Sequence, residues 1–186
     1  MILNFPENTA IIGNGPKEIG KGSGKIIDSF EFVARMNNFD ISNKFIPDYG
    51  QKVDFWVTSF NKDIWPREEN ISRIFCPFDY EHPNWSWKYK AHKPLLERYA
   101  EITEFIPPDI FAELFVLHQH PSTGIAFLYW IFKSQGERLD TSHIFGFSHF
   151  SPEDIHQYWH HKGENSPGTD HDFDKTERQL FLGMTL

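Results

Sequence analysis

The stretch AIIGNGPKEIGKGSGKIIDSFEFVARMNN, residues 10–38, predicts the fold of this 186-residue chain. An apolar run at 10–12 ends in the turn Gly13-Asn14-Gly15, and further glycines follow before a short helical pattern. A second apolar run at 32–34 ends in polar residues at 35–38. Strand, glycine turn, helix and strand in this order form the first half of a nucleotide-binding α/β unit. The small residues and the helix start predict that a phosphate or ribose approaches the backbone here.

The bulk composition indicates a globular protein, which we take as one domain over residues 1–186. Hydrophobic residues make up 39% and charged residues 24%, and the net charge of -8 gives no reason to expect nucleic acid as a partner. The single cysteine, Cys76, excludes an internal disulfide and favours a reducing compartment. The sequence shows neither a signal peptide nor a membrane-spanning run, so we expect a cytoplasmic protein without an integral membrane segment. Attachment at the inner membrane surface is left open.

Apolar runs alternate with helical patterns along the rest of the chain. This alternation predicts a Rossmann-like α/β fold, a mostly parallel sheet with helices on both faces. Ser122 and Thr123 after a proline mark a helix start, and the apolar residues behind them predict a buried helix. Residues 142–147 are expected to form a late central strand, and 40–51 a loop. The expected strands are 9–12, 32–36, 53–58, 72–76, 102–105 and 142–147, and the expected helices are 25–30, 94–101, 109–117, 125–133, 156–161 and 172–182.

Four short motifs stand at separate places in the chain. The first combines G-N-G at 13–15 with G-K-I-I-D at 24–28, R-M-N at 35–37 and D-Y-G at 48–50. The second is P-S-T-G at 121–124 with F-G-F at 145–147. The third is H-Q-Y-W at 156–159, and the fourth is His171 followed by Glu177. In order and spacing they resemble the large, small, third and very short sialylmotifs of glycosyltransferase family 29, the sialyltransferases.

The resemblance implies a metal-independent, inverting glycosyltransferase with a GT-A-like variant of the Rossmann-like fold. Its donor would be CMP-activated sialic acid or the related acid Kdo, its acceptor a sugar hydroxyl of a glycan, and no cofactor is implied. His171 matches the family's general base, and Glu177 would either hold its segment or orient the imidazole. The positions that match donor-binding residues are Gly13, Asn14, Gly15, Asn37, Ser122, Thr123, Gly124, His156, Gln157 and Tyr158.

The sequence departs from the family pattern in the third motif. Gln157 stands where the family usually has a histidine that contacts the donor phosphate. Glutamine donates a hydrogen bond but carries no charge, so His156 is a candidate substitute. The cysteines that link two motifs in animal relatives are missing, and the sheet must therefore hold by packing alone.

Two other functions fit parts of the sequence. Asp172 and Asp174 form a D-x-D, which in other glycosyltransferases ligates a divalent metal on a nucleotide-sugar, although aspartate also commonly caps a helix. A non-catalytic nucleotide-binding domain is the second alternative, because the third motif is altered. An NAD-type site is disfavoured, since the second strand ends in R-M-N rather than in an acidic residue. Remaining histidines such as His118 are expected to be structural or solvated, and the aromatic residues of 85–89 to pack rather than to stack on an acceptor sugar.

Overall fold

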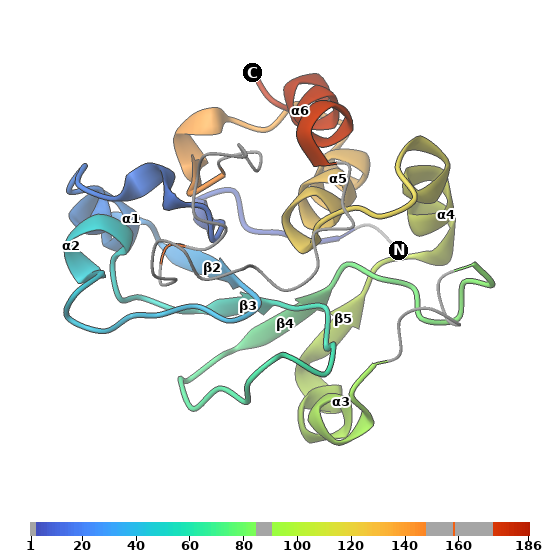
Figure 1. Ribbon diagram of the computed structural model, residues 1–186, viewed down its shortest axis with the longest axis horizontal. Helices are drawn as coiled ribbons and strands as arrows, with labels where there is room; N and C mark the ends of the chain where they lie inside the picture. The colour runs from blue at the N-terminus through green and yellow to red at the C-terminus, as the bar shows by residue number, and fades with distance from the viewer. Residues whose placement is uncertain (1–2, 85–90, 148–157, 159–172) are drawn as a thin grey trace.

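The computed structural model describes residues 3–84, 91–147, 158 and 173–186, and only the backbone of 173–175. The described strands form one sheet in the order β5-β4-β3-β2-β1-β6, and every neighbouring pair is parallel (Figure 1). The expected parallel α/β fold is therefore confirmed. The strands are β1 (Thr9–Ile12), β2 (Phe32–Met36), β3 (Phe55–Val57), β4 (Arg73–Cys76), β5 (Thr103–Phe105) and β6 (Ile144–Phe145).

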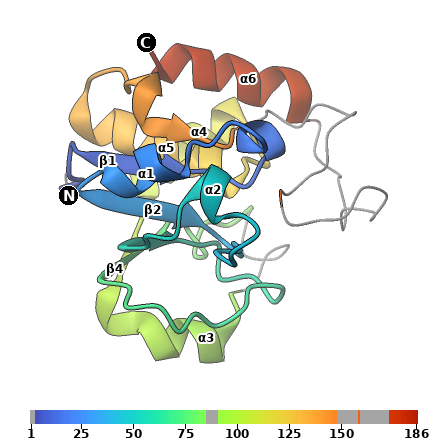
Figure 2. The same cartoon turned by 90° about the vertical axis from the view of Figure 1, so that its left-hand side faces the viewer.

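Helices cover both faces of this sheet (Figures 1 and 2). On one face α5 packs across the strands, with α4 and α6 against it, whereas α1, α2 and α3 lie on the other face. No helix in the described part of the chain is long and apolar enough to cross a bilayer. The helices are α1 (Gly24–Ser29), α2 (Ile46–Tyr49), α3 (Lys93–Tyr99), α4 (Pro108–Leu117), α5 (Thr123–Gln135) and α6 (Phe173–Met184), with short 3-10 turns η1 (Pro16–Glu18), η2 (Ala100–Ile102) and η3 (Thr141–His143).

The strand residues supply two cores because successive side chains point to opposite faces of a sheet. Ile11 belongs to the larger core under α5, whereas Ala10 and Ile12 pack with Ile27 of α1 on the opposite face. A strand buried on both sides has to be apolar throughout, which is the pattern of 10–12 in the sequence.

The buried helix α5 was expected from its apolar sequence, and all residues from 123 to 131 are buried. Phe127 packs against Phe75 of β4 with ring centroids 5.3 Å apart, while α4 and α6 cover the other sides of the helix. On the far face Trp56 of β3 meets Tyr99 of α3 edge-on at 5.4 Å. Aromatic packing thus fixes the middle of the sheet from both sides.

The prediction of a late central strand at 142–147 is wrong. Within the described residues, β6 spans two residues and lies at the edge of the sheet, paired with β1 alone. Asp140 causes part of the difference, because its carboxylate accepts a hydrogen bond from Ser142 N at 2.8 Å and starts the turn η3. Gly146 ends the strand with a φ of 68°. A local capping interaction therefore replaces strand geometry on one side, and a left-handed glycine replaces it on the other.

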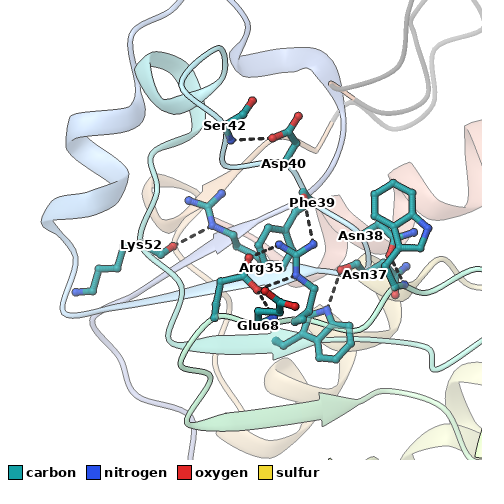
Figure 3. Close-up of polar contacts among 12 residues, drawn as sticks. Arg35, Asn37, Asn38, Phe39, Asp40, Ser42, Lys52 and Glu68 are labelled. Atoms are coloured by element: carbon teal, nitrogen blue, oxygen red, sulfur yellow. Dashed lines mark hydrogen bonds and ion pairs between the residues drawn. The ribbon is translucent and has the colours of Figure 1, made fainter. Parts of the chain in front are cut away.

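The interval 40–51, expected to be a loop, contains the single turn α2. Its end is fixed by Arg35 of β2, a buried side chain whose Nε donates to Lys52 O at 2.9 Å and whose Nη2 donates to Tyr49 O at 2.8 Å (Figure 3). Burial lowers the pKa of the Arg35 guanidinium from its ordinary value. Arg35 therefore acts as a structural clamp between β2 and the segment after α2. The expected helix at 156–161, Tyr158 apart, and the aromatic stretch 85–89 lie outside the described residues.

Candidate functional site

Asn37, directly after β2, joins two of the motifs that lie far apart in the sequence. Its Nδ2 donates to Thr123 Oγ1 at 3.0 Å, across a separation of 86 residues, and its Oδ1 accepts from Ser59 N at 3.0 Å. The backbone of Asn37 has a φ of 44°, a left-handed conformation that asparagine tolerates better than most residues. Its carbonyl accepts from Trp56 Nε1 at 2.8 Å. These contacts place the Asn37 amide at the start of α5.

Asn14, in the turn after β1, pins the ends of the first two strands together. Its Nδ2 donates to Met36 O at 3.0 Å and to Asn38 O at 2.9 Å. Figure 3 shows Asn37 and Asn38 next to each other beyond β2. Because an amide has two N–H donors, the one side-chain group that Asn14 can still offer a ligand is its oxygen, a hydrogen-bond acceptor.

Four N–H groups of the glycine-rich segment, which the sequence predicts to face an anion, have partners within the protein. Gly13 N donates to Phe145 O at 2.8 Å, and Gly15 N donates to Gly146 O at 2.7 Å. The N–H groups of Gly20 and Gly22 both donate to the Asp48 carboxylate, at 2.8 and 2.9 Å. These four donors are therefore used by the fold, with Asp48 standing where an external anion was expected.

Gly13 and Gly124 are small for a packing reason, because both backbones meet the ring of Phe147. A Cβ on Gly124 would lie 2.7 Å from Phe147 Cε1, and a Cβ on Gly13 would lie 2.8 Å from Phe147 Cδ2. Both distances are shorter than side chains permit. The two motif glycines thus let one phenylalanine hold the end of β1 against the start of α5.

Ser122 caps α5, and Glu177 of α6 in turn holds Ser122. Ser122 Oγ accepts from Ile125 N at 3.3 Å and donates to Glu177 Oε2 at 3.0 Å, while Ser122 N donates to Glu177 Oε1. The Glu177 side chain is 1% exposed, and His118 Nε2 lies 3.5 Å from Glu177 Oε1. A protonated His118 would form an ion pair with this carboxylate. Glu177 therefore ties α6 to the N-terminus of α5, while its predicted action on the His171 imidazole stays a prediction.

This arrangement sets the charge at the start of α5. The N-terminus of a helix carries a partial positive charge and N–H groups without intrahelical partners. Thr123 and Gly124 are the first two residues of α5, and the Glu177 carboxylate already lies beside them. An anionic ligand at this place therefore meets N–H and hydroxyl donors together with a fixed negative charge.

Tyr158 of the third motif lies in the smaller core instead of presenting its hydroxyl outward. Its ring stacks on Tyr49 with centroids 3.9 Å apart, and its hydroxyl accepts from Asp40 N at 2.8 Å and donates to Asp40 O at 2.7 Å. Tyr158 N donates to Asn14 O at 2.9 Å. Burial raises the pKa of Tyr158 to about 12, so the side chain stays neutral at physiological pH. Tyr158 thus supports the turn that contains Asn14 through its backbone N–H.

Several residues of this region were not predicted from the sequence. Glu18 is buried beside the glycine turn, where it accepts from Ser23 Oγ at 2.8 Å, and Asn38 and His118 were also missed as partners. The repeated asparagine at 37–38 was the available signal for Asn38. Across the described residues, no group of three His, Cys, Asp or Glu could hold a metal ion. His156, Gln157, His171, Asp172 and the side chain of Asp174 lie outside the described residues.

Removal of the Glu177 carboxylate should destabilise the fold. Glu177→Ala leaves Ser122 N and Oγ without their acceptor. We expect the free energy of unfolding to fall by about 2–4 kcal/mol, because hydrogen bonds to charged groups are strong and a buried polar group without a partner is costly. Urea unfolding followed by circular dichroism measures the difference. Glu137→Ala, at an exposed position, serves as the control and should change stability by less than about 0.5 kcal/mol. Equal stability of the two variants would contradict the clamp.

A methyl group at Gly124 should disrupt the packing of Phe147. We expect Gly124→Ala to lower the free energy of unfolding by about 1–3 kcal/mol, the usual cost of overpacking. Gly183→Ala is the matched control, since a Cβ at Gly183 in α6 would have no neighbour within 4 Å. That change should be neutral or stabilise by up to about 1 kcal/mol. In a Phe147→Ala background the penalty of Gly124→Ala should largely disappear, and an unchanged penalty would show that the clash is not with this ring.

Comparisons with known proteins bear on the fold and on the family. Two solved structures of a mammalian sialyltransferase resemble the chain. One has a TM-score of 0.60 and 22% identity, and the other, in complex with Gal-beta-1-3GalNAc-ortho-nitrophenol, has 0.59 and 21%. Each alignment covers 94% of this chain and 64% of the mammalian one, so this chain matches less than two thirds of those proteins. At this identity the likeness shows a shared fold, and no curated protein matches the chain.

The family model gives the stronger result. The model described as glycosyltransferase family 29 (sialyltransferase) matches residues 7–182, an interval that contains the glycine turn, the start of α5 and Glu177. This interval is nearly the whole chain. The protein therefore belongs to glycosyltransferase family 29, the sialyltransferase family.

Proposed function

We propose that this chain transfers sialic acid, or the related acid Kdo, from a CMP-activated donor to a hydroxyl of an acceptor sugar. The observation that best supports the proposal is the hydrogen bond between Asn37 and Thr123, which unites the large and small motifs at the carboxyl edge of the sheet. Ligands of open parallel sheets bind outside this edge. The family match over residues 7–182 supports the reaction class.

The donor-side polar groups suit a nucleotide with a charged sugar. The side-chain oxygen of Asn14 is an acceptor for a ribose hydroxyl or a base amino group. The hydroxyl of Thr123 and the first N–H groups of α5 are donors for a carboxylate or phosphate oxygen. Because Glu177 already places a negative charge there, the donor phosphate needs further support. We assign that support to His156 and Gln157 of the third motif.

The proposed reaction is a direct displacement that inverts the anomeric centre. The acceptor oxygen forms a bond to the anomeric carbon while the bond to the phosphate oxygen breaks, and CMP leaves with the electron pair. His171 takes the proton of the attacking hydroxyl, a role that suits an imidazole with a pKa near neutrality. The protein's main contributions are positioning and charge stabilisation, since a phosphate is a tolerable leaving group.

Nucleotide binding separates this proposal from its alternatives. Isothermal calorimetry with CMP, CDP, UDP and NAD should show selective CMP binding that survives a chelator. We expect Asn37→Asp, which keeps the acceptor oxygen and tolerates the left-handed backbone, to weaken CMP binding at least tenfold, because it removes the amide donor and adds negative charge. Asn70→Asp adds the same charge at an exposed position and should leave binding unchanged.

The other outcomes are equally informative. UDP or CDP binding that is lost with a chelator would favour a metal-dependent transferase that uses Asp172 and Asp174. CMP binding without transfer to any glycan would favour a non-catalytic nucleotide-binding domain. Absence of binding to every nucleotide would overturn the proposal.

The general-base role of His171 makes a kinetic prediction. His171→Ala should lower transfer from CMP-sialic acid or CMP-Kdo by at least about 100-fold, the usual contribution of a general base, while CMP affinity is retained. The wild-type rate should fall with decreasing pH as the imidazole becomes protonated, and this pH dependence should be absent in the variant. His92→Ala, an exposed position at the start of α3, is the control. Undiminished transfer by a folded His171→Ala variant rules the role out.

A further inference from the structure

Trp65, in the segment between β3 and β4, exposes an unusually large apolar side chain. The residue is 56% exposed, whereas Trp56 and Trp130 are buried in the core. Exposure of a large aromatic ring is more informative than its burial, because core packing does not explain it. We propose that Trp65 is the platform on which the acceptor sugar ring stacks, an inference that rests on the proposed transfer to a sugar hydroxyl.

Hydrogen bonds with Asn38 and Asn61 hold the backbone that leads to Trp65. Asn38 Oδ1 accepts from Trp65 N at 2.8 Å, and Asn38 Nδ2 donates to Asp63 O at 2.8 Å. Asn61 accepts from Asp63 N at 2.9 Å, and the side chain of Ile64 is buried. The segment is thus a pre-organised support for an exposed ring, and rigidity lowers the entropic cost of binding a ligand.

Arg67, two residues after Trp65, is fixed to the segment that follows β2. Arg67 Cζ lies 3.7 Å from the centroid of the Phe39 ring, and Arg67 Nη1 donates to Phe39 O at 3.1 Å. Arg67 Nε donates to Glu69 Oε2 at 3.0 Å, which neutralises the guanidinium. The charge of Arg67 is therefore paired with Glu69, close in sequence to the exposed indole.

A short series of contacts links the platform to the donor-side residues. Trp65 N bonds to Asn38, and the Asn38 carbonyl accepts from Asn14 Nδ2 at 2.9 Å. Asn38 also follows Asn37 directly in the chain, and Asn37 donates to Thr123. Trp65 therefore lies next to the asparagine pair, to which its backbone N–H is bonded.

The chemistry of the exposed ring selects a class of ligand. A pyranose with several C–H groups on one side offers an apolar face that packs flat on an indole, while its hydroxyls stay at the edges. Lys62 and Asp63 precede Trp65 by three and two residues, and their side chains are exposed. They offer a hydrogen-bond donor and an acceptor of the kind that sugar hydroxyls use. A pyranoside that presents such a C–H face is therefore the class of ligand that fits this platform.

Variants at Trp65 test the inference through acceptor binding. Methyl β-D-galactopyranoside, methyl β-D-glucopyranoside and methyl α-D-mannopyranoside are the probes, titrated with and without CMP and followed by saturation-transfer NMR. We expect Trp65→Ala to weaken binding of the glycoside that the wild-type protein binds most tightly at least tenfold, and to raise its KM as acceptor by the same factor with CMP affinity unchanged. Trp65→Phe, which keeps an aromatic face, should retain most of the binding.

Phe105→Ala provides the matched control, because Phe105 is an aromatic residue 45% exposed at the end of β5. It should change neither glycoside nor CMP binding. Glycoside binding that is unaffected by Trp65→Ala, or wild-type protein that binds none of the three glycosides, would overturn the inference. The calorimetric CMP titration does not depend on glycoside binding or on Trp65. Absence of nucleotide binding would therefore overturn the proposed function, whereas absence of glycoside binding would overturn only the role of Trp65.

Discussion

The hydrogen bond between Asn37 and Thr123 is the contact on which the candidate site depends. It requires Asn37 to leave β2 in a left-handed conformation, which Val57 O and Trp56 Nε1 fix from the neighbouring strand. It also requires α5 to begin at the edge of the sheet. A parallel sheet supplies this condition, since all its strands end at the same edge and helices return across its face.

The buried carboxylate of Glu177 gives the site its second constraint. A charge removed from water needs strong partners, and Ser122 supplies both its N–H and its hydroxyl. The negative carboxylate also interacts favourably with the partial positive charge at the N-terminus of α5. The same feature disfavours a second anion nearby. Under the proposed function, the donor phosphate therefore needs further donors, which we assign to the third motif.

The N–H groups of four glycines in the first loop have partners within the fold. Gly13 N and Gly15 N donate to the carbonyls of Phe145 and Gly146, Gly20 N and Gly22 N donate to Asp48, and Gly13 faces the Phe147 ring at close range. This differs from a phosphate-binding loop, in which such N–H groups point at the ligand. Under the proposed function, recognition therefore depends on side chains, those of Asn14 and Asn37 for the donor and that of Trp65 for the acceptor.

The sequence by itself determined the parallel α/β fold, the bounds of β1 and β2, and the asparagines at their ends. Apolar runs and helix-start residues are local signals, and the family motifs stand in order along the chain. Only the tertiary structure decided that Asp48 takes the glycine N–H groups, that Glu177 holds Ser122, and that the final strand is a two-residue edge. In the first two cases, acceptors distant in sequence compete for the same hydrogen-bond donors. In the third, a capping interaction competes with strand geometry. The geometry of the folded chain decides such competitions, because a donor bonds to whichever acceptor the packing brings within reach.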